Sequence, residues 1–140
     1  MKRASLVSVL ALLGLLAAAP AVHAAPPTSP FGGHWEGPDP IDSSNLDAFI
    51  SGGDHPQILY TDDEATQACE GSSDPSFTSF LTGTISGDDL NSTIRWANCG
   101  TVHLFFTGFT ITWTLDDQGD VDPSNDVLTN SFGETYARAS

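Results

Sequence analysis

The stretch FTITWTLDDQGDVDPSND, residues 109–126, contains the two patterns that decide the fold. In its first half, apolar residues occupy every second position from Phe109 to Leu115 and threonines stand between them, as in a strand with one buried face. In its second half, five aspartates surround a glycine and a proline, with no basic residue among them. We therefore expect a strand that places Phe109 and Trp113 in the core, followed by a polar loop.

The sequence on both sides of this stretch has the same strand-and-turn character. Short runs of threonine, serine, β-branched and aromatic residues are interrupted by glycine, proline and aspartate, and helical spacing of apolar residues is absent after residue 30. This pattern is typical of an antiparallel all-β domain. We expect strands at residues 33–36, 45–51, 57–61, 65–69, 77–86, 90–97, 102–106, 109–115 and 127–138.

About eight short strands would leave exposed edges that aggregate unless the sheet closes on itself. We therefore predict a small antiparallel β-barrel, with a two-layer β-sandwich as the alternative. Trp96 shares a strand face with Leu90 and Ile94, which places it in the predicted core. A barrel of this size has room for side chains or for one small ligand. We expect a filled interior that contains the aromatic residues Trp35, Trp96, Phe106, Phe109 and Trp113.

The N-terminus has the features of a secretory signal of bacterial type. Lys2 and Arg3 precede the apolar run LVSVLALLGLLAAA, and Val22 and Ala24 supply the small residues that a signal peptidase recognises. The run is short for a membrane span, and an uncleaved anchor is the alternative. We predict a cleaved signal peptide at residues 1–24, a flexible leader at 25–30 and one domain at 31–140, in a protein secreted to the exterior or to the periplasm.

The charge balance is strongly acidic, with eighteen acids against four lysines and arginines. Once Lys2 and Arg3 leave with the signal, Arg95 and Arg138 are the remaining basic residues other than histidine. Such a surface repels phosphate backbones and anionic lipid headgroups. We expect no nucleic-acid partner, no membrane association after cleavage, and a soluble monomer. A calcium-rich exterior or a cationic partner would also suit this charge.

Cys69 and Cys99 are the only cysteines. In an exported protein such a pair predicts a disulfide. The loop that it closes corresponds to roughly 3–4 kcal/mol of stabilisation by the chain-entropy model. A redox or metal site is the alternative, but the pair lacks C-x-x-C spacing.

The aspartate-rich loop allows two interpretations. A calcium-binding frame that starts at Asp116 puts oxygen ligands at several of the expected offsets. Val121 stands where that frame needs glycine, and Val127 stands where it needs a bidentate glutamate. The loop is therefore either the solvated tip of a hairpin or a weak calcium site formed by Asp116, Asp120, Asp122 and Asp126. We expect no other cofactor.

Signals for catalysis and for zinc are weak. His34, His55 and His103 show neither H-x-H nor H-x-x-x-H spacing. A G-x-S-x-G nucleophile motif is absent, and acids are too frequent for any one pair to stand out. We expect no enzyme activity and no catalytic residues, with a small hydrolase that uses two facing carboxylates as the alternative.

Two short motifs resemble a known superfamily. Gly33-His34-Trp35 near the start of the domain and Arg138 near its end resemble the G-x-W…Arg arrangement of the calycin barrels, the lipocalins and avidins. That resemblance implies that Trp35 plugs one end of the barrel and that Arg138 lies across its ring. A guanidinium over an indole face is a favourable cation–π contact. The T-D-Y motif of lipocalins and the biotin set of avidins are absent, so the resemblance implies a fold and no particular ligand.

The chain is also similar overall to small secreted bacterial proteins of uncharacterised function. The similarity lies in the late segment DVLTNSFGETYAR and in the cysteine pair. Taken together, these features lead us to expect a secreted, non-enzymatic β-barrel, with binding of a small apolar ligand as its candidate activity. An acidic extracellular protein that binds calcium or a cationic partner is the main alternative.

Overall fold

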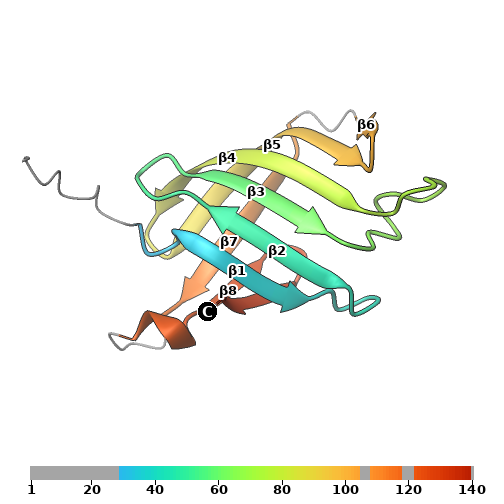
Figure 1. Ribbon diagram of the computed structural model, residues 1–140. Coiled ribbons are helices and arrows are strands. Elements are labelled where there is room, and N and C mark those ends of the chain that lie inside the picture. The colour runs from blue at the N-terminus through green and yellow to red at the C-terminus, as the bar shows by residue number, and fades with distance from the viewer. Residues whose placement is uncertain (1–28, 105–107, 118–121, 140) are drawn as a thin grey trace, which may run out of the picture.

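The computed structural model describes residues 29–104, 108–117 and 122–139, and in that part of the chain the fold is all-β (Figure 1). Nine strands and one short 3₁₀ helix account for the regular structure of the described residues. The strands are β1 (Gly33–Pro38), β2 (Asn45–Ile50), β3 (Gln57–Asp62), β4 (Phe77–Ser86), β5 (Asp89–Cys99), β6 (Val102–Leu104), β7 (Thr110–Asp116), β8 (Val127–Asn130) and β9 (Thr135–Arg138), and the helix is η1 (Pro123–Asn125).

The strands close into an antiparallel barrel in chain order. The order β4-β3-β2-β1-β9-β8-β7-β5 is closed by pairing of β4 with β5, and β6 adds one strand beside β5. The joint between β1 and β9 is tight, because a Cβ on Gly37 would lie 2.1 Å from the carbonyl oxygen of Thr135. The predicted eight-strand barrel is therefore confirmed, and the sandwich alternative is wrong.

The two ends of the barrel differ. Loops 39–44, 63–76 and 131–134 lie at the end where β1 finishes and β2 begins, on the right in Figure 1. We call this end the mouth. The turns 51–56 and 87–88, helix η1 and the start of β1 lie at the other end, which we call the floor. The fold thus brings segments that are far apart in the sequence together at each end of the barrel.

The floor half of the interior is filled by large side chains. The rings of Trp35 and Trp113 are both fully buried. The Trp113 Nε1–H donates to the Ser92 hydroxyl over 2.9 Å, and that hydroxyl donates to the Ile111 carbonyl over 2.9 Å. Every polar group of this indole is therefore satisfied in the apolar interior. The other buried apolar residues of the core include Leu46, Ile58, Leu81, Leu90, Leu128 and Tyr136.

Two of the predicted strands differ in the structure. Residues 65–69 form turns instead of a strand, because the Cys69 N–H bonds back to the Ala65 carbonyl and the Ala65 N–H bonds to the Pro75 carbonyl. The segment 127–138 is a hairpin, β8–β9, and not one strand. Its turn is fixed by the Asn130 side chain, which accepts the N–H groups of residues 132 and 134.

Two of the predicted core aromatics lie outside the core. The register of β4 and β5 shifts between the pairs Phe80–Trp96 and Leu81–Ile94, which leaves Arg95 as an extra residue. This bulge turns Trp96 to the outer surface, where its ring stacks on Phe80 at 6.0 Å. Phe109 is 48% exposed, so its placement in the core is wrong. Phe106 lies outside the described residues.

The structure tests the predicted disulfide but not the predicted signal peptide. Cys69 and Cys99 form the predicted disulfide, with their Cα atoms 5.5 Å apart. The expected signal segment, residues 1–24, and most of the leader lie outside the described residues. Among the residues that are described, none belongs to a helix of the length and apolar character needed to cross a membrane.

Candidate functional site

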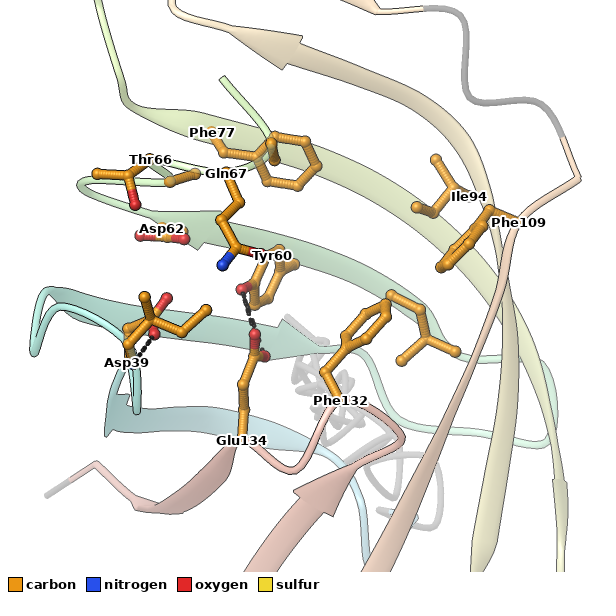
Figure 2. Close-up of a pocket in the computed structure, with 14 residues that line it drawn as sticks. Asp39, Tyr60, Asp62, Thr66, Gln67, Phe77, Ile94, Phe109, Phe132 and Glu134 are labelled. Carbon is orange, nitrogen blue, oxygen red and sulfur yellow. Dashed lines mark hydrogen bonds between the residues drawn. The ribbon is translucent and has the colours of Figure 1, made fainter. Parts of the chain in front are cut away.

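A cavity of about 400 Å³ occupies the mouth half of the barrel (Figure 2). Two of the five aromatic residues that were expected to fill the interior leave space for this cavity, because Trp96 lies outside the barrel and Phe109 lies at the rim. We call this cavity the mouth pocket. Its lining residues are Asp39, Ile41, Tyr60, Asp62, Ala65, Thr66, Gln67, Ala68, Phe77, Ile94, Phe109, Ile111, Phe132 and Glu134.

One wall of the mouth pocket is apolar and open to solvent. The rings of Phe109 and Phe132 stack with their centroids 5.8 Å apart, and Figure 2 shows both on the same side of the pocket. Phe132 is 53% exposed and Phe109 is nearly as exposed. Buried side chains of Ile94 and Ile111 lie deeper on this wall. Exposed aromatic rings around a hollow are typical of a surface that a ligand covers.

The opposite side of the pocket contains a hydrogen-bonded carboxylate. The Tyr60 hydroxyl donates to Glu134 at 3.3 Å, as the dashed line in Figure 2 marks, and the Tyr136 hydroxyl donates to Glu134 Oε2 at 2.5 Å. The Asn130 amide donates to the same oxygen at 2.5 Å. Burial, and then the charge of Glu134, raises the pKa of Tyr60. Both tyrosines therefore remain protonated donors, and the Glu134 carboxylate is held in one orientation.

Two further carboxylates belong to the same side. Asp39 is 7% exposed and Asp62 is 5% exposed, and both line the pocket. Asp62 Oδ1 accepts the Ser44 hydroxyl and the Glu64 N–H, each at 3.0 Å, and Asp39 Oδ1 accepts the N–H of residue 41 at 2.6 Å. Burial raises the pKa of Asp62, and the neighbouring charges of Asp39 and Asp42 raise it further. The pocket thus brings together three carboxylates that are far apart in the sequence.

The roof of the pocket is the loop 63–76. Residues 65–68 of this loop line the cavity. The disulfide attaches the next residue, Cys69, to the end of β5, and the Gly100 N–H bonds to the Ser76 carbonyl at 2.8 Å. Because the loop has no strand of its own, these covalent and hydrogen-bonded attachments fix its position.

The floor contains the contact that the resemblance implies. The Arg138 guanidinium lies 4.2 Å from the centre of the Trp35 ring. It donates to Asp126 Oδ2 at 3.0 and 3.1 Å, to the Gly32 carbonyl at 2.8 Å, and to the Pro30 carbonyl. Gly33 has a φ of 137°, and a Cβ there would lie 3.1 Å from Arg138 Nη1. This motif closes the floor of the barrel, and neither Trp35 nor Arg138 lines the mouth pocket.

Of the four aspartates of the predicted calcium loop, the three that the structure describes, Asp116, Asp122 and Asp126, belong to no group of possible metal ligands. Asp126 is 6% exposed and is engaged by Arg138. Asp122 Oδ1 accepts the Ser124 N–H at 3.0 Å and so caps η1. Asp116 is at the end of β7, and Asp120 lies outside the described residues. Calcium binding in this loop stays a prediction. Asp126 already forms an ion pair with Arg138.

A histidine and two acids meet on the outer face of β1 and β2. The ligand atoms of His34, Glu36 and Asp47 lie within 4.8 Å of one another. His34 Nε2 is 2.5 Å from Asp47 Oδ1, and the ring stacks on Phe49 at 4.1 Å. Two ligands of one tetrahedral zinc ion are about 3.3 Å apart. Because His34 Nε2 and Asp47 Oδ1 are closer together than this, we interpret them as a hydrogen-bonded pair, with Glu36 as an acidic neighbour. Sequence reasoning missed it, although the alternate spacing of residues 34 and 36 on a strand was a usable signal.

Comparison with family models, with curated proteins and with solved structures finds no significant match. The geometry of the mouth pocket is therefore the basis for assigning a function to this protein. Sequence reasoning did not find these pocket residues, because Tyr60 and Asp62 lie at the end of β3 and Phe132 and Glu134 lie in the turn 131–134, and only barrel closure brings the two segments together.

Proposed function

We propose that this protein is a secreted, non-enzymatic β-barrel that binds a small, largely apolar ligand in the mouth pocket. The observation that supports this proposal is the cavity of about 400 Å³ with exposed aromatic rings at its rim. Pockets that hold small molecules measure about 300–1,000 Å³ and combine apolar walls with a few fixed polar groups. The Trp35–Arg138 contact fits a calycin-type barrel, a class that the sequence motifs also resemble, and the disulfide suits an oxidising compartment outside the cytoplasm.

The proposed binding follows from burial of apolar surface. A ligand that enters the pocket covers the rings of Phe109 and Phe132 and removes them from water, which contributes about 25 cal/mol for each Å² of apolar surface. The hydrogen bonds around Glu134 hold the polar side in place before the ligand arrives. Such a preorganised site loses little conformational entropy on binding.

Titration with a neutral fluorescent lipophile, N-phenyl-1-naphthylamine, tests the proposal. We expect its emission to rise and shift to the blue with saturable, one-to-one binding. The substitution Phe132→Ala should weaken binding about tenfold, because it removes one ring of the wall. Phe49→Ala is the matched control, since Phe49 is 44% exposed but lies on the outer face of β2. Absence of saturable binding, or equal loss in both variants, would contradict the proposal.

A small hydrolase is the second candidate, because the pocket contains buried carboxylates and the pKa of one, Asp62, is raised. We place it second because Asp39 and Asp62 each accept a backbone N–H from their own loop, which is a structural role. Release of nitrophenol from a panel of nitrophenyl glycosides and esters, with loss of that activity in Asp62→Asn, would favour the hydrolase.

The third candidate is an acidic extracellular protein that binds calcium or a cationic protein through its surface loops. The excess of acids over basic residues supports it. Calorimetric titration with calcium at physiological salt is its test, and heat release with a raised melting temperature is the supporting result.

A further inference from the structure

We infer that the ligand of the mouth pocket is a small amphiphile with a positively charged group, such as a protonated amine attached to an aromatic or aliphatic body. This inference rests on the proposed binding function and adds the chemical class of the ligand. It follows from the side of the pocket that faces the aromatic wall, which holds Asp39, Asp62 and Glu134.

The negative charge of this side is not balanced by any cation in the described part of the chain. Arg138 lies at the floor against Asp126, and Arg95 donates to Thr82 on an exposed strand face. The described residues that line the pocket include no lysine, arginine or histidine. The donors to the three carboxylates are hydroxyl, amide and backbone N–H groups, which are all neutral.

Two of the carboxylates also keep an oxygen without a partner. Asp39 and Asp62 use Oδ1 for every hydrogen bond that they make to the described residues, and Oδ2 of each accepts none there. Both side chains are more than nine-tenths buried and line the cavity. Neither Oδ2 is among the fully buried, unpaired side-chain atoms of the described residues, so both oxygens are accessible to a group that enters the pocket. A cationic group in the pocket can donate to these oxygens, and it offsets the two effects that raise the pKa of Asp62, namely burial and the charges of Asp39 and Asp42.

The two sides of the pocket then have separate roles. Figure 2 shows the Phe109 and Phe132 rings on one side of the hollow and the Tyr60–Glu134 contact on the other. The body of the ligand packs against the rings while its charged end lies beside Glu134 and the two aspartates. Aromatic faces also attract a cation directly, so the wall and the acids favour the same charge.

Three naphthalene compounds of similar size test the inference: 1-naphthylmethylamine, 1-naphthalenemethanol and 1-naphthoate, each titrated by calorimetry at neutral pH and low salt. We expect the amine to bind at least tenfold more tightly than the alcohol, and the carboxylate to bind most weakly. Raising the salt concentration should reduce the advantage of the amine but leave the affinity of the alcohol nearly unchanged.

Two variants locate the charge that matters. Glu134→Gln keeps an oxygen that accepts the Tyr136 and Asn130 bonds, and Asp62→Asn keeps Oδ1 for Ser44 and Glu64. Each should reduce the preference for the amine over the alcohol to about threefold or less, because the lost charge weakens binding of the amine more than binding of the alcohol. Glu36→Gln, which removes one charge from the outer face, is the matched control and should keep the full preference.

The outcomes separate the inference from the proposed function. If the alcohol and the carboxylate bind as tightly as the amine, the pocket binds ligands but the inference of a cationic ligand is wrong. The inference is also wrong if Glu36→Gln lowers the preference as much as Glu134→Gln does. If none of the three compounds binds, the proposed function itself fails, and the inference fails with it.

Discussion

Arg138 makes several separate contacts at the floor of the barrel. It covers the Trp35 ring, pairs with the buried carboxylate of Asp126 and bonds to the Pro30 and Gly32 carbonyls. We expect Arg138→Ala to lower the free energy of unfolding by about 3 kcal/mol, because it leaves Asp126 buried without its partner. Urea denaturation followed by tryptophan fluorescence measures the change.

Arg95→Ala is the comparison for that measurement. Arg95 is exposed and donates to Thr82. Its removal should change the free energy of unfolding by less than about 0.5 kcal/mol. Equal effects of the two substitutions would show that the floor contact has no special role in stability.

Two buried serines should respond oppositely to the same substitution. The Ser92 hydroxyl accepts the Trp113 indole N–H, whereas the Ser79 hydroxyl has no hydrogen-bond partner among the described residues. Ser92→Ala should cost about 1–3 kcal/mol because the indole N–H loses its acceptor. Ser79→Ala should leave stability unchanged or raise it by up to about 1 kcal/mol, because an unsatisfied hydroxyl is removed. Thermal or urea unfolding of both variants checks the contrast, and a similar loss in both contradicts it.

Among the elements of the fold, the loop 63–76 depends most on a covalent link. Replacing both Cys69 and Cys99 by alanine should lower the free energy of unfolding by roughly 3–4 kcal/mol, as expected for the loop that the disulfide closes. Because residues 65–68 roof the pocket, the variant should also lose affinity for N-phenyl-1-naphthylamine. A reducing agent should reproduce both effects in the native protein and have no further effect on the variant. Intact binding after reduction would show that the roof does not need the disulfide.

The strands themselves were largely predictable. The two-residue alternation predicted the whole of β2 and β4 and most of β3, β5 and β7, since period and turn residues are local signals. The bulge at Arg95 was not predictable, because it follows from the pairing of β4 with β5 and not from the sequence of either strand alone. The same shift moved Trp96 outward and left the mouth half of the barrel hollow. The alternation of apolar and polar residues within one strand does not show a change of register between two paired strands.

For the molecule as a whole, the burial of Asp62 makes stability depend on pH. Its pKa in the folded state is raised above the ordinary value of 3.8, mainly by burial. The folded state therefore binds more protons than the unfolded state at pH values just above 3.8, and stability falls as the pH rises through that window. We expect Asp62→Asn to be more stable than the native protein at about pH 7 and equal to it below about pH 4. Urea midpoints measured across this range test it, and a difference that does not vary with pH would contradict it.

The joint between β1 and β9 has a consequence for the order of folding events. Arg138 and Gly32, which bond across it, are 106 residues apart in the chain. Contacts of such long range form late and slowly, since most of the chain must be ordered before its two extremes meet. A polypeptide still emerging from the ribosome lacks β9 and cannot close the floor of its barrel. The barrel therefore cannot close until β9 has been synthesised, and until then its unpaired strand edges remain open to aggregation.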